Sequence, residues 1–308
     1  MLAHLTPAEG GLSLRPSPVA EPEPRPDQAV VEVRAVSVNR GDLSLLAMLP
    51  PGSRLGFDVA GTVVRAAADG SGPPPGTRVA GVAEQDGWSE RVALATTRLA
   101  PLPDGVEWAQ AAAVPVAGLT ALYALRYAGS VLGRRVLVTG AGGGVGRIAV
   151  QLARAAGADV VAWAGSAERT KGLTGLGAGT ATTYAEGPAA TGPVDVLLDS
   201  VGGDVLRSAY GLVVRRGTVV CYGNTVRAEL SLPFDWGHAR PGVGLRYLHL
   251  FDEMTRRPVG RDLAALFRLV ADGGLDPQVA FTGVWSDPEP ALRRLAERRI
   301  NGKAVLLR

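Results

Sequence analysis

Cysteine and long apolar runs are scarce in this chain of 308 residues. The only cysteine, Cys221, excludes an internal disulfide and any zinc site built from several cysteines. It stands in TVVCYG, at the end of a predicted strand, where we expect a buried core thiol. No apolar run reaches the ~18 residues that a membrane span needs, and the N-terminus has no basic patch before an apolar core. We therefore expect a cytoplasmic protein that does not contact membranes.

Histidine and lysine are also few. The three histidines, His4, His238 and His249, are too far apart in sequence to suggest a chelating motif. Lysine occurs only at positions 171 and 303, so nearly all basic residues are arginines, scattered along the chain. No arginine cluster is interleaved with aromatic residues, so the pI of about 9.3 and the net charge of +3 do not indicate nucleic-acid binding.

The pattern of predicted secondary structure changes near Pro115. Short alternating stretches and turns before this point are typical of β-structure, whereas strands and helices alternate after it. Such alternation favours a parallel sheet wrapped by helices. We expect strands at 136–139, 159–163, 194–198, 217–221, 244–250 and 303–308, and helices at 145–156, 168–176, 203–215 and 259–272.

A glycine-rich stretch, VLVTGAGGGVG, joins a β-branched run to an amphipathic segment. It is not a P-loop, because no Gly-Lys-Ser/Thr follows, and Ala141 interrupts a perfect G-x-G-x-x-G. Read as G-x-x-G-x-x-G, it places Gly140, Gly143 and Gly146 between a strand and a helix. Backbone N–H groups and the helix N-terminus favour an anion there. The stretch therefore predicts that the loop binds the pyrophosphate of a dinucleotide.

The strand that follows, Asp159 to Trp163, indicates which dinucleotide. NAD-preferring sites usually place a carboxylate at this strand tip, about 20 residues past the glycines, to bond the ribose 2′-hydroxyl. This chain has Ser166 and Arg169 there, and Glu168 is expected to face solvent from a helix. A hydroxyl and a guanidinium suit a 2′-phosphate, which predicts NADPH.

Seven stretches occur in the order typical of medium-chain dehydrogenases/reductases: VEVRAVSVNRGDL, LGFDVAGTVV, GTRVAGV, LAPLPDGVEWAQAAAVPVAGLTALYAL, VLVTGAGGGVGRIAVQLARAAGA, VDVLLDSVGGD and INGKAVLL. The chain most resembles their zinc-independent quinone oxidoreductases and enoyl reductase-like relatives. The resemblance implies an α/β fold, with a GroES-like β-rich catalytic domain and a Rossmann, doubly wound parallel-sheet domain that binds NADPH. The implied domains are 1–115, joined by 256–308 returning to it, and 116–255.

Zinc-dependent members of this superfamily hold a catalytic metal by Cys or His residues and a Glu. The corresponding ligand position here resembles Asn39, and the usual Gly-His-Glu becomes Gly56-Phe57-Asp58. We therefore expect no metal. Without zinc to polarise an alcohol oxygen, reduction of an already polarised acceptor fits better than alcohol oxidation.

The resemblance also implies which residues contact the cofactor. In this interpretation Thr120 approaches the nicotinamide, Val201 lies under its ribose, and Tyr184 flanks the adenosine phosphate. The full implied set is Thr120, Gly140, Gly143, Gly144, Val145, Gly146, Ser166, Arg169, Tyr184, Val201, Gly223, Asn224, Asn301 and Lys303. Two members have a structural alternative: Thr120 could bond a helix backbone, and Lys303 could be a solvated surface charge.

Asn39 and Asp42 occupy positions that line the active cleft in the family, and we take them as catalytic candidates. Asn39 could hydrogen-bond an acceptor carbonyl, or it could hold a turn at a strand end. Asp42 could instead cap a helix that begins near Leu43. Polyketide-type enoyl reductases commonly carry a Tyr soon after this Asp and a Lys where Arg169 stands, and this chain has neither. Proton delivery from water is therefore the simpler expectation.

Three large rings, Trp236, Tyr247 and Phe251, follow the nucleotide-binding strands. They could stack against a flat conjugated acceptor or fill a domain interface. The apolar segment 244–250 resembles the edge strand that pairs with its copy in a homodimer.

Together these observations predict an NADPH-dependent, zinc-independent reductase that transfers a hydride to a quinone or an α,β-unsaturated carbonyl. One alternative is a tailoring enoyl or keto reductase of polyketide-type biosynthesis. Another, of a different class, is an NADPH-binding protein with little turnover, because no general acid is evident.

Overall fold

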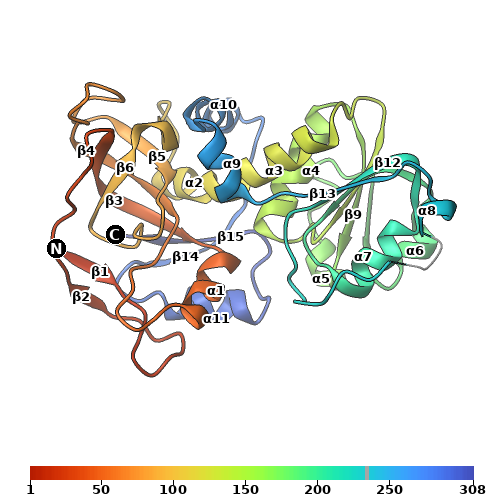
Figure 1. Ribbon diagram of the computed structural model, residues 1–308, viewed down its shortest axis with the longest axis horizontal. Coiled ribbons are helices and arrows are strands. Elements are labelled where there is room, and N and C mark those ends of the chain that lie inside the picture. Colours follow the sequence, from red (N-terminus) through yellow and green to blue (C-terminus); the bar gives the residue numbers. More distant parts are fainter. Residues whose placement is uncertain (233–235) are drawn as a thin grey trace. The chain divides into compact units, whose positions relative to one another are not determined.

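Two compact units make up the chain. The structure, a computed structural model, describes residues 1–232 and 236–308, without the side chain of Trp236. One unit comprises Met1–Leu119 and Met254–Arg308, and the second comprises Thr120–Glu253. Helices α3 (Pro115–Ala128) and α9 (Leu250–Arg256) lead the chain from one unit to the other (Figure 1).

The first unit is built on a sheet that, within the described residues, runs in the order β14-β15-β3-β4-β5-β7, with β6 also paired to β3. Strand β15, near the C-terminus, lies between β14 and β3 and is antiparallel to β3. The elements are β1 (Leu2–His4), β2 (Pro16–Pro18), β3 (Gln28–Val38), α1 (Arg40–Met48), β4 (Asp58–Arg65), β5 (Arg78–Val82), β6 (Arg91–Ala95), a 3-10 turn η1 (Thr96–Arg98), β7 (Leu99–Pro101), α2 (Trp108–Ala113), α10 (Gly260–Ala271), β14 (Val279–Val284), α11 (Glu289–Ala296) and β15 (Lys303–Leu307).

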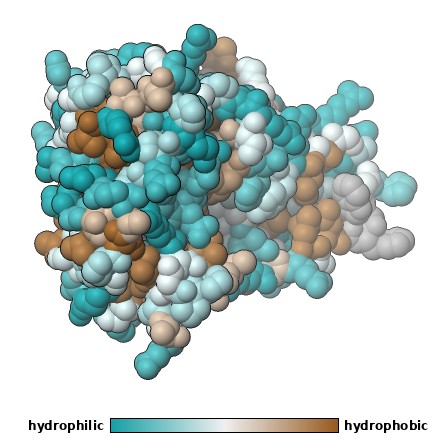
Figure 2. All heavy atoms as spheres, turned by 60° about the vertical axis from the view of Figure 1, so that its left-hand side comes forward, coloured by the Kyte–Doolittle hydropathy of each residue, from teal (hydrophilic) through white to brown (hydrophobic). Residues whose placement is uncertain are grey.

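Valine-rich strands give this unit its core. Val31, Val33 and Val36 of β3 are fully buried, and Trp88 packs with them. On the face seen in Figure 2, hydrophilic side chains predominate and hydrophobic ones form small separate groups. Among the described residues, none of the helices combines the length and the apolar character that crossing a membrane requires.

The second unit is a parallel sheet with the strand order β10-β9-β8-β11-β12-β13 over the described part of the chain. In chain order this is 3-2-1-4-5-6, the doubly wound arrangement, whose direction reverses between β8 and β11. Ligands bind such sheets outside the carboxyl ends of the strands at that point. The elements are β8 (Arg135–Thr139), α4 (Gly144–Ala155), β9 (Asp159–Ala164), α5 (Ala167–Thr170), β10 (Thr180–Thr183), α6 (Gly187–Ala190), β11 (Val194–Asp199), α7 (Gly203–Tyr210), β12 (Val213–Cys221), α8 (Trp236–Ala239) and β13 (Gly244–Tyr247).

The predicted α/β class is confirmed, but four predicted elements are wrong in extent, one of them the strand predicted at 217–221, which spans Val213–Cys221. The helix predicted at 168–176 ends at Thr170, because Gly172 and Gly177 adopt left-handed backbone angles. The helix predicted at 203–215 ends at Tyr210, and β12 begins at Val213, where β-branched residues favour a strand. The strand predicted at 244–250 ends at Tyr247, and α9 begins at Leu250.

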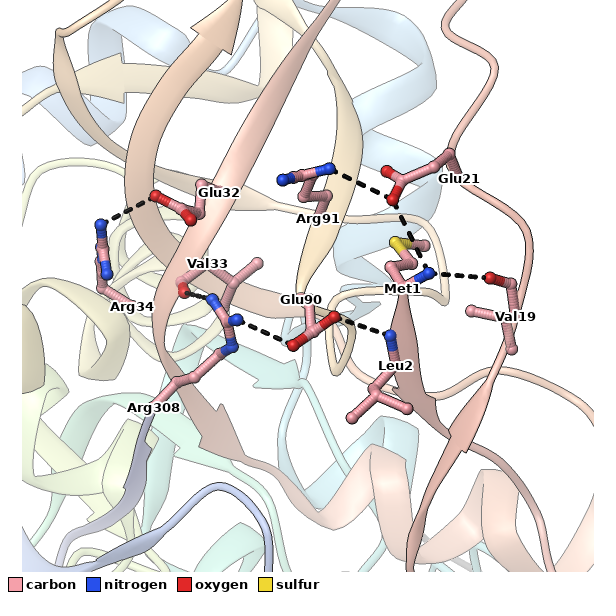
Figure 3. A network of polar contacts seen from close by, with 10 residues as sticks. All are labelled: Met1, Leu2, Val19, Glu21, Glu32, Val33, Arg34, Glu90, Arg91 and Arg308. Atoms are coloured by element: carbon pink, nitrogen blue, oxygen red, sulfur yellow. Dashed lines mark hydrogen bonds and ion pairs between the residues drawn. The ribbon is translucent and has the colours of Figure 1, made fainter.

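The carboxylate of Glu90 joins the two ends of the chain in the first unit (Figure 3). Its Oε2 accepts the backbone N–H of Leu2 and its Oε1 accepts Arg308 Nη2, both at 2.8 Å. The Leu2 N–H and the Arg308 guanidinium hold the pKa of Glu90 below its usual value. Arg308 also donates to the carbonyl of Val33, so one carboxylate ties the first strand to the end of the last.

Glu90→Gln should therefore lower the urea midpoint of unfolding by an amount equivalent to about 1 kcal/mol at neutral pH. A carboxylate whose pKa is lowered by folding stabilises the fold above its unfolded pKa and loses this effect as the pH falls through the folded value. The difference from the wild type should thus shrink in acid. Glu23→Gln, on an exposed side chain, is the matched control. A difference that persists unchanged below about pH 3 would contradict this account.

Candidate functional site

The glycine loop connects β8 to α4 at the point where the strand order reverses. Gly140 has φ 63°, and a Cβ there would lie 2.3 Å from Ser200 Oγ. A Cβ on Gly146 would lie 2.4 Å from the carbonyl oxygen of Gly140. Any larger residue would therefore displace the loop from the helix. Between them, Gly143, Gly144 and Val145 are only partly buried, which leaves their backbone accessible to a ligand.

The tip of β9 lies beside this loop. A Cβ on Gly142 would meet the carbonyl oxygen of Arg169 at 2.7 Å and its Nε at 3.4 Å, so Arg169 lies next to the glycine turn. Ser166 is the N-cap residue of α5, but its exposed side chain makes no capping bond. Glu168 is exposed and pairs with Lys171 at 2.5 Å, as expected of a solvent-facing carboxylate. The tip thus presents a hydroxyl and a guanidinium.

A second arginine, Arg147, stands close to the same tip. It follows Gly146 in α4, is only 6% exposed, and donates from Nη2 to the carbonyl of Lys171 at 2.6 Å. Its Nη1 would lie 3.5 Å from a Cβ on Gly172. Sequence reasoning missed this residue, because Arg147 lies on the side of α4 opposite its apolar stripe, where a charged residue is ordinary.

The carboxyl ends of β11 and β12 are neighbours, and β11 borders the reversal point. The loop after β12 lies along the residues that follow β11, since the N–H of Val226 donates to the carbonyl of Val201 at 3.1 Å. Asn224 bonds its own loop through Ala228 and lies against Gly202, where a Cβ would meet its Oδ1 at 2.4 Å. The structure thus brings Val201, Gly223 and Asn224 together.

Asp199 holds this end of β11 to β8. Its carboxylate accepts Thr139 Oγ1 at 2.5 Å and the N–H of Gly202 at 3.0 Å. Burial raises its pKa despite these bonds. Cys221 lies at the end of β12, and burial raises the pKa of its thiol to about 12, so it is a core residue as expected.

Two further cofactor candidates belong to this unit. Tyr184 follows β10, and its ring lies 3.4 Å from the position of a Cβ on Gly165, just after β9. This places it beside the strand tip described above. Thr120 lies within α3 and is 7% exposed. Their contacts with a nucleotide stay predictions.

The first unit holds a cluster of buried polar side chains. Lys303 Nζ donates to Asn39 Oδ1 at 2.7 Å and to Asp58 Oδ2 at 3.2 Å. Asp58 Oδ2 also accepts Asn39 Nδ2 at 2.8 Å and Ser37 Oγ at 2.5 Å. Asp58 Oδ1 accepts the N–H of Val116, in the first turn of α3, at 2.7 Å. Every oxygen of this buried carboxylate is therefore bonded, which compensates the cost of its burial.

Strand register creates the cluster. Ser37 is opposite Asp58 in the β3–β4 pair, and Ala304 is opposite Val38 in the β15–β3 pair. Lys303 precedes Ala304 and Asn39 follows Val38. Because the two strands are antiparallel, Lys303 and Asn39 meet at the same end of the sheet. Lys303 is 3% exposed, so its alternative interpretation as a solvated surface charge is wrong. Asn301 lies just before β15 and is half-buried.

Asp42 lies behind the cluster, fully buried. The helix expected near Leu43 begins at Arg40, because Asn39 is its N-cap and Asp42 its third residue. Asp42 Oδ2 accepts the backbone N–H of Asn39 at 2.6 Å, and no bond to Oδ1 occurs among the described residues. Burial raises the pKa of Asp42 to about 7. The interpretation of Asp42 as the cap of a helix beginning near Leu43 is therefore wrong in position: Asn39 is the N-cap, and Asp42 accepts the N–H of Asn39 from inside the first turn.

Sequence reasoning did not select Asp58 or Ser37 as site residues. Asp58 had a signal, because it stands where zinc-dependent relatives carry a glutamate. Ser37 had none, since it becomes relevant only through its place opposite Asp58.

The predicted aromatic substrate pocket is only partly described. Tyr247 is 60% exposed on the edge strand β13, and Phe251 lies in α9 with its ring 6.1 Å from that of His249. The side chain of Trp236 lies outside the described residues. Stacking of an acceptor on these rings stays a prediction.

Comparisons with known proteins identify this architecture. Residues 25–124 match the model of the alcohol dehydrogenase GroES-like domain, and residues 144–249 match that of the zinc-binding dehydrogenases. A quinone oxidoreductase of Pseudomonas aeruginosa is 33% identical over 92% of both chains. The chain belongs to the medium-chain dehydrogenase/reductase superfamily. The resemblance inferred from the seven stretches is confirmed.

Within the superfamily the chain falls in the branch of quinone oxidoreductases and polyketide-synthase enoyl reductases. A spectinabilin polyketide synthase protein of Streptomyces orinoci is 37% identical over 98% of this chain, which spans 14% of that relative's length. The solved quinone oxidoreductase of Thermus thermophilus, described with its NADPH complex, is 30% identical, with a TM-score of 0.81 and full coverage of both chains.

The family model's name mentions zinc, but the donor set in this member differs. Across residues 1–232 and 236–308, no group of three or more His, Cys, Asp or Glu side chains is placed to hold a metal ion. The positions that resemble ligand positions in the sequence motifs hold Asn39, Phe57 and Asp58. Asp58 is already bonded on both oxygens, which leaves a poor donor set for zinc.

Gly146→Ala tests the glycine loop of this dehydrogenase/reductase. The added methyl must displace the loop backbone, so the dissociation constant of NADPH should rise about tenfold or more, as expected for an overpacking cost of about 1–3 kcal/mol. Fluorescence titration of the purified chain measures it. Gly274→Ala, where a Cβ would meet only ordinary contacts, is the control. Unchanged affinity in Gly146→Ala would show that the loop does not hold the nucleotide.

Proposed function

We propose that this chain is an NADPH-dependent reductase that transfers a hydride to a quinone or an α,β-unsaturated carbonyl without a metal ion. The observation that carries the proposal is the set of hydrogen bonds and the ion pair made by the buried carboxylate of Asp58. Its Oδ2 accepts bonds from Ser37, Asn39 and Lys303, and its Oδ1 accepts the N–H of Val116, so both oxygens of this carboxylate are already bonded within the protein. This supports reduction of an acceptor that is already polarised rather than metal-assisted oxidation of an alcohol.

The glycine loop and the nearby arginines of the second unit suit the phosphate groups of a dinucleotide. Gly140 and Gly146 leave no room for side chains in the loop, which favours close approach of a pyrophosphate. Ser166, Arg169 and Arg147 would hold the 2′-phosphate, and Tyr184 would lie near the adenosine. NADPH, when bound, supplies the hydride. The NADPH complex of the Thermus relative supports the same cofactor.

The chain's own residues would bind and orient the acceptor. Asn39 is half-buried and its amide is a donor, so it can hydrogen-bond a carbonyl oxygen at the edge of the buried cluster. Negative charge develops on this oxygen during reduction, and preorganised donors stabilise it. The proton that completes the reaction would come from water.

A second candidate is enoyl reduction on a polyketide-type thioester. The identity to the polyketide synthase protein, 37% over nearly the whole chain, favours it. The absence of a Tyr between Asp42 and Phe57 disfavours the Tyr-assisted version of that reaction. The two candidates share the cofactor and differ in the acceptor.

A panel of acceptors tests the proposal. Oxidation of NADPH, followed by its absorbance with benzoquinones, naphthoquinones, simple enones and a crotonyl thioester, should show turnover with at least one acceptor and should persist in a metal chelator. Preference for the thioester would select the second candidate. Tight NADPH binding with no turnover on any acceptor would instead indicate a binding protein, and loss of turnover in chelator would refute the metal-free reaction.

Arg169→Ala tests the choice of cofactor. Loss of a charged hydrogen bond to the 2′-phosphate should weaken NADPH binding by about 1–3 kcal/mol and leave NADH binding nearly unchanged. Isothermal titration with both nucleotides measures the difference. Arg207→Ala, an exposed arginine paired with Asp204 in the same unit, is the matched control. Equal losses for both nucleotides would overturn the assignment.

The homodimer expected from the sequence also stays a proposal. Strand β13 forms the edge of its sheet, and all four of its residues are exposed, including Leu245 and Tyr247. Such an edge can pair with a second copy. Light scattering that gives the mass of a single chain would exclude this dimer.

A further inference from the structure

Arg147 is a charged residue that is buried although it lies on the polar side of its helix. An arginine opposite the apolar stripe of an amphipathic helix normally points into water. The exposure of Arg147 is nevertheless only 6%. Its Nη2 donates to the carbonyl of Lys171 at 2.6 Å, and its Nη1 would lie 3.5 Å from a Cβ on Gly172. The segment that follows β9 therefore covers this guanidinium.

The segment around α5 is short and exposed. Helix α5 has four residues, fewer than a helix needs to be stable alone. Its N-cap residue, Ser166, makes no side-chain capping bond, and Gly172 beyond its C-terminus adopts φ 79°. Every residue from 165 to 172 is exposed or half-buried. Contacts from outside the segment must therefore fix its position.

Two contacts hold α5 beside the glycine loop and α4. The carbonyl oxygen of Arg169 would lie 2.7 Å from a Cβ on Gly142, so this part of α5 is in close contact with the loop. Lys171 is the C-cap residue, and its carbonyl belongs to those without a partner inside the helix. Arg147 bonds that carbonyl with a cation, which a helix favours at its C-terminus.

We propose that Arg147 is the positioning residue of the 2′-phosphate site, because it fixes the segment that carries Ser166 and Arg169 against the glycine loop. This inference rests on the cofactor proposed above. Arg169 stands two residues before the bonded carbonyl of Lys171, so a shift of that carbonyl moves the Arg169 guanidinium. Charged hydrogen bonds to a phosphate depend on such orientation. Arg147 thus holds the phosphate indirectly.

The first experiment compares Arg147→Met with the wild type. Methionine adapts to the space and removes the donor. We expect the dissociation constant of NADPH, from isothermal titration, to rise about tenfold, and that of NADH less than about threefold. Arg154→Met, at an exposed arginine of the same helix, is the matched control. NADPH affinity within about threefold of wild type, or equal losses for both nucleotides, would overturn the proposal.

A second comparison separates positioning from direct contact. In an Arg169→Ala background, adding Arg147→Met should raise the NADPH dissociation constant by no more than about threefold, because the guanidinium that Arg147 positions is already absent. A further rise of about tenfold or more would show that Arg147 acts on the phosphate independently of Arg169, and the positioning role would then be wrong.

Proteolysis reads the segment without any nucleotide. Lysine occurs only at positions 171 and 303, and Lys303 is 3% exposed, so lysyl endopeptidase should cut the folded chain only after Lys171. Such cleavage requires local opening of the segment. We expect Arg147→Met to be cut about tenfold faster than the wild type, and Arg154→Met at the wild-type rate. Equal rates for all three chains would overturn the positioning role even if the chain is an active reductase.

The wild type alone gives a test that no variant's folding can disturb. Cleavage after Lys171 should be at least about tenfold slower in the folded chain than in the chain unfolded by urea. Equal rates in the two states would show that the segment is not held, contrary to the proposal. A slowly cut segment in a chain that binds neither NADPH nor NADH would refute the proposed function instead.

Discussion

The burial of a negative charge at Asp58 determines the organisation of the first unit. A carboxylate withdrawn from water needs a bond for each of its lone pairs and a nearby cation. Ser37, Asn39 and the start of α3 supply the bonds, and Lys303 supplies the cation. Lys303 comes from the last strand of the chain. The C-terminal segment must therefore return to the first sheet and pair with β3 before this charge is compensated.

The second unit depends on a different constraint, the approach of backbone to backbone at the reversal of strand order. Gly140 and Gly146 let the loop, the helix and Ser200 lie in direct contact. Asp199 then fixes the ends of β8 and β11 to each other through Thr139 and Gly202. The result is a loop whose residues 143–145 are partly exposed, bordered by Arg169 and Arg147. Its chemistry suits a phosphate, whereas that of the first unit suits a polar acceptor.

The outcome of the sequence predictions follows from how local each signal is. Helix α4 was located well because its apolar stripe and the glycines before it are contained in one short segment. The helix predicted at 168–176 is wrong because the prediction relied on apolar spacing and ignored nearby glycines. Two of these glycines, Gly172 and Gly177, adopt left-handed backbone angles. The helix predicted at 203–215 failed because its last residues, Val213 and Val214, belong to a strand. In that segment, packing against β11 outweighed a continuous helical pattern.

The sequence by itself determined the α/β class, the superfamily and the glycine loop, since each depends on residues that are neighbours along the chain. It also listed Asn39, Asp42 and Lys303 without relating them to one another. Only the tertiary structure decided that Lys303 is buried, that it bonds an amide 264 residues away, and that Asp58 joins them. These contacts follow from strand register. Pairing of β15 with β3 and of β3 with β4 brings Lys303, Asn39 and Asp58 to one end of a sheet.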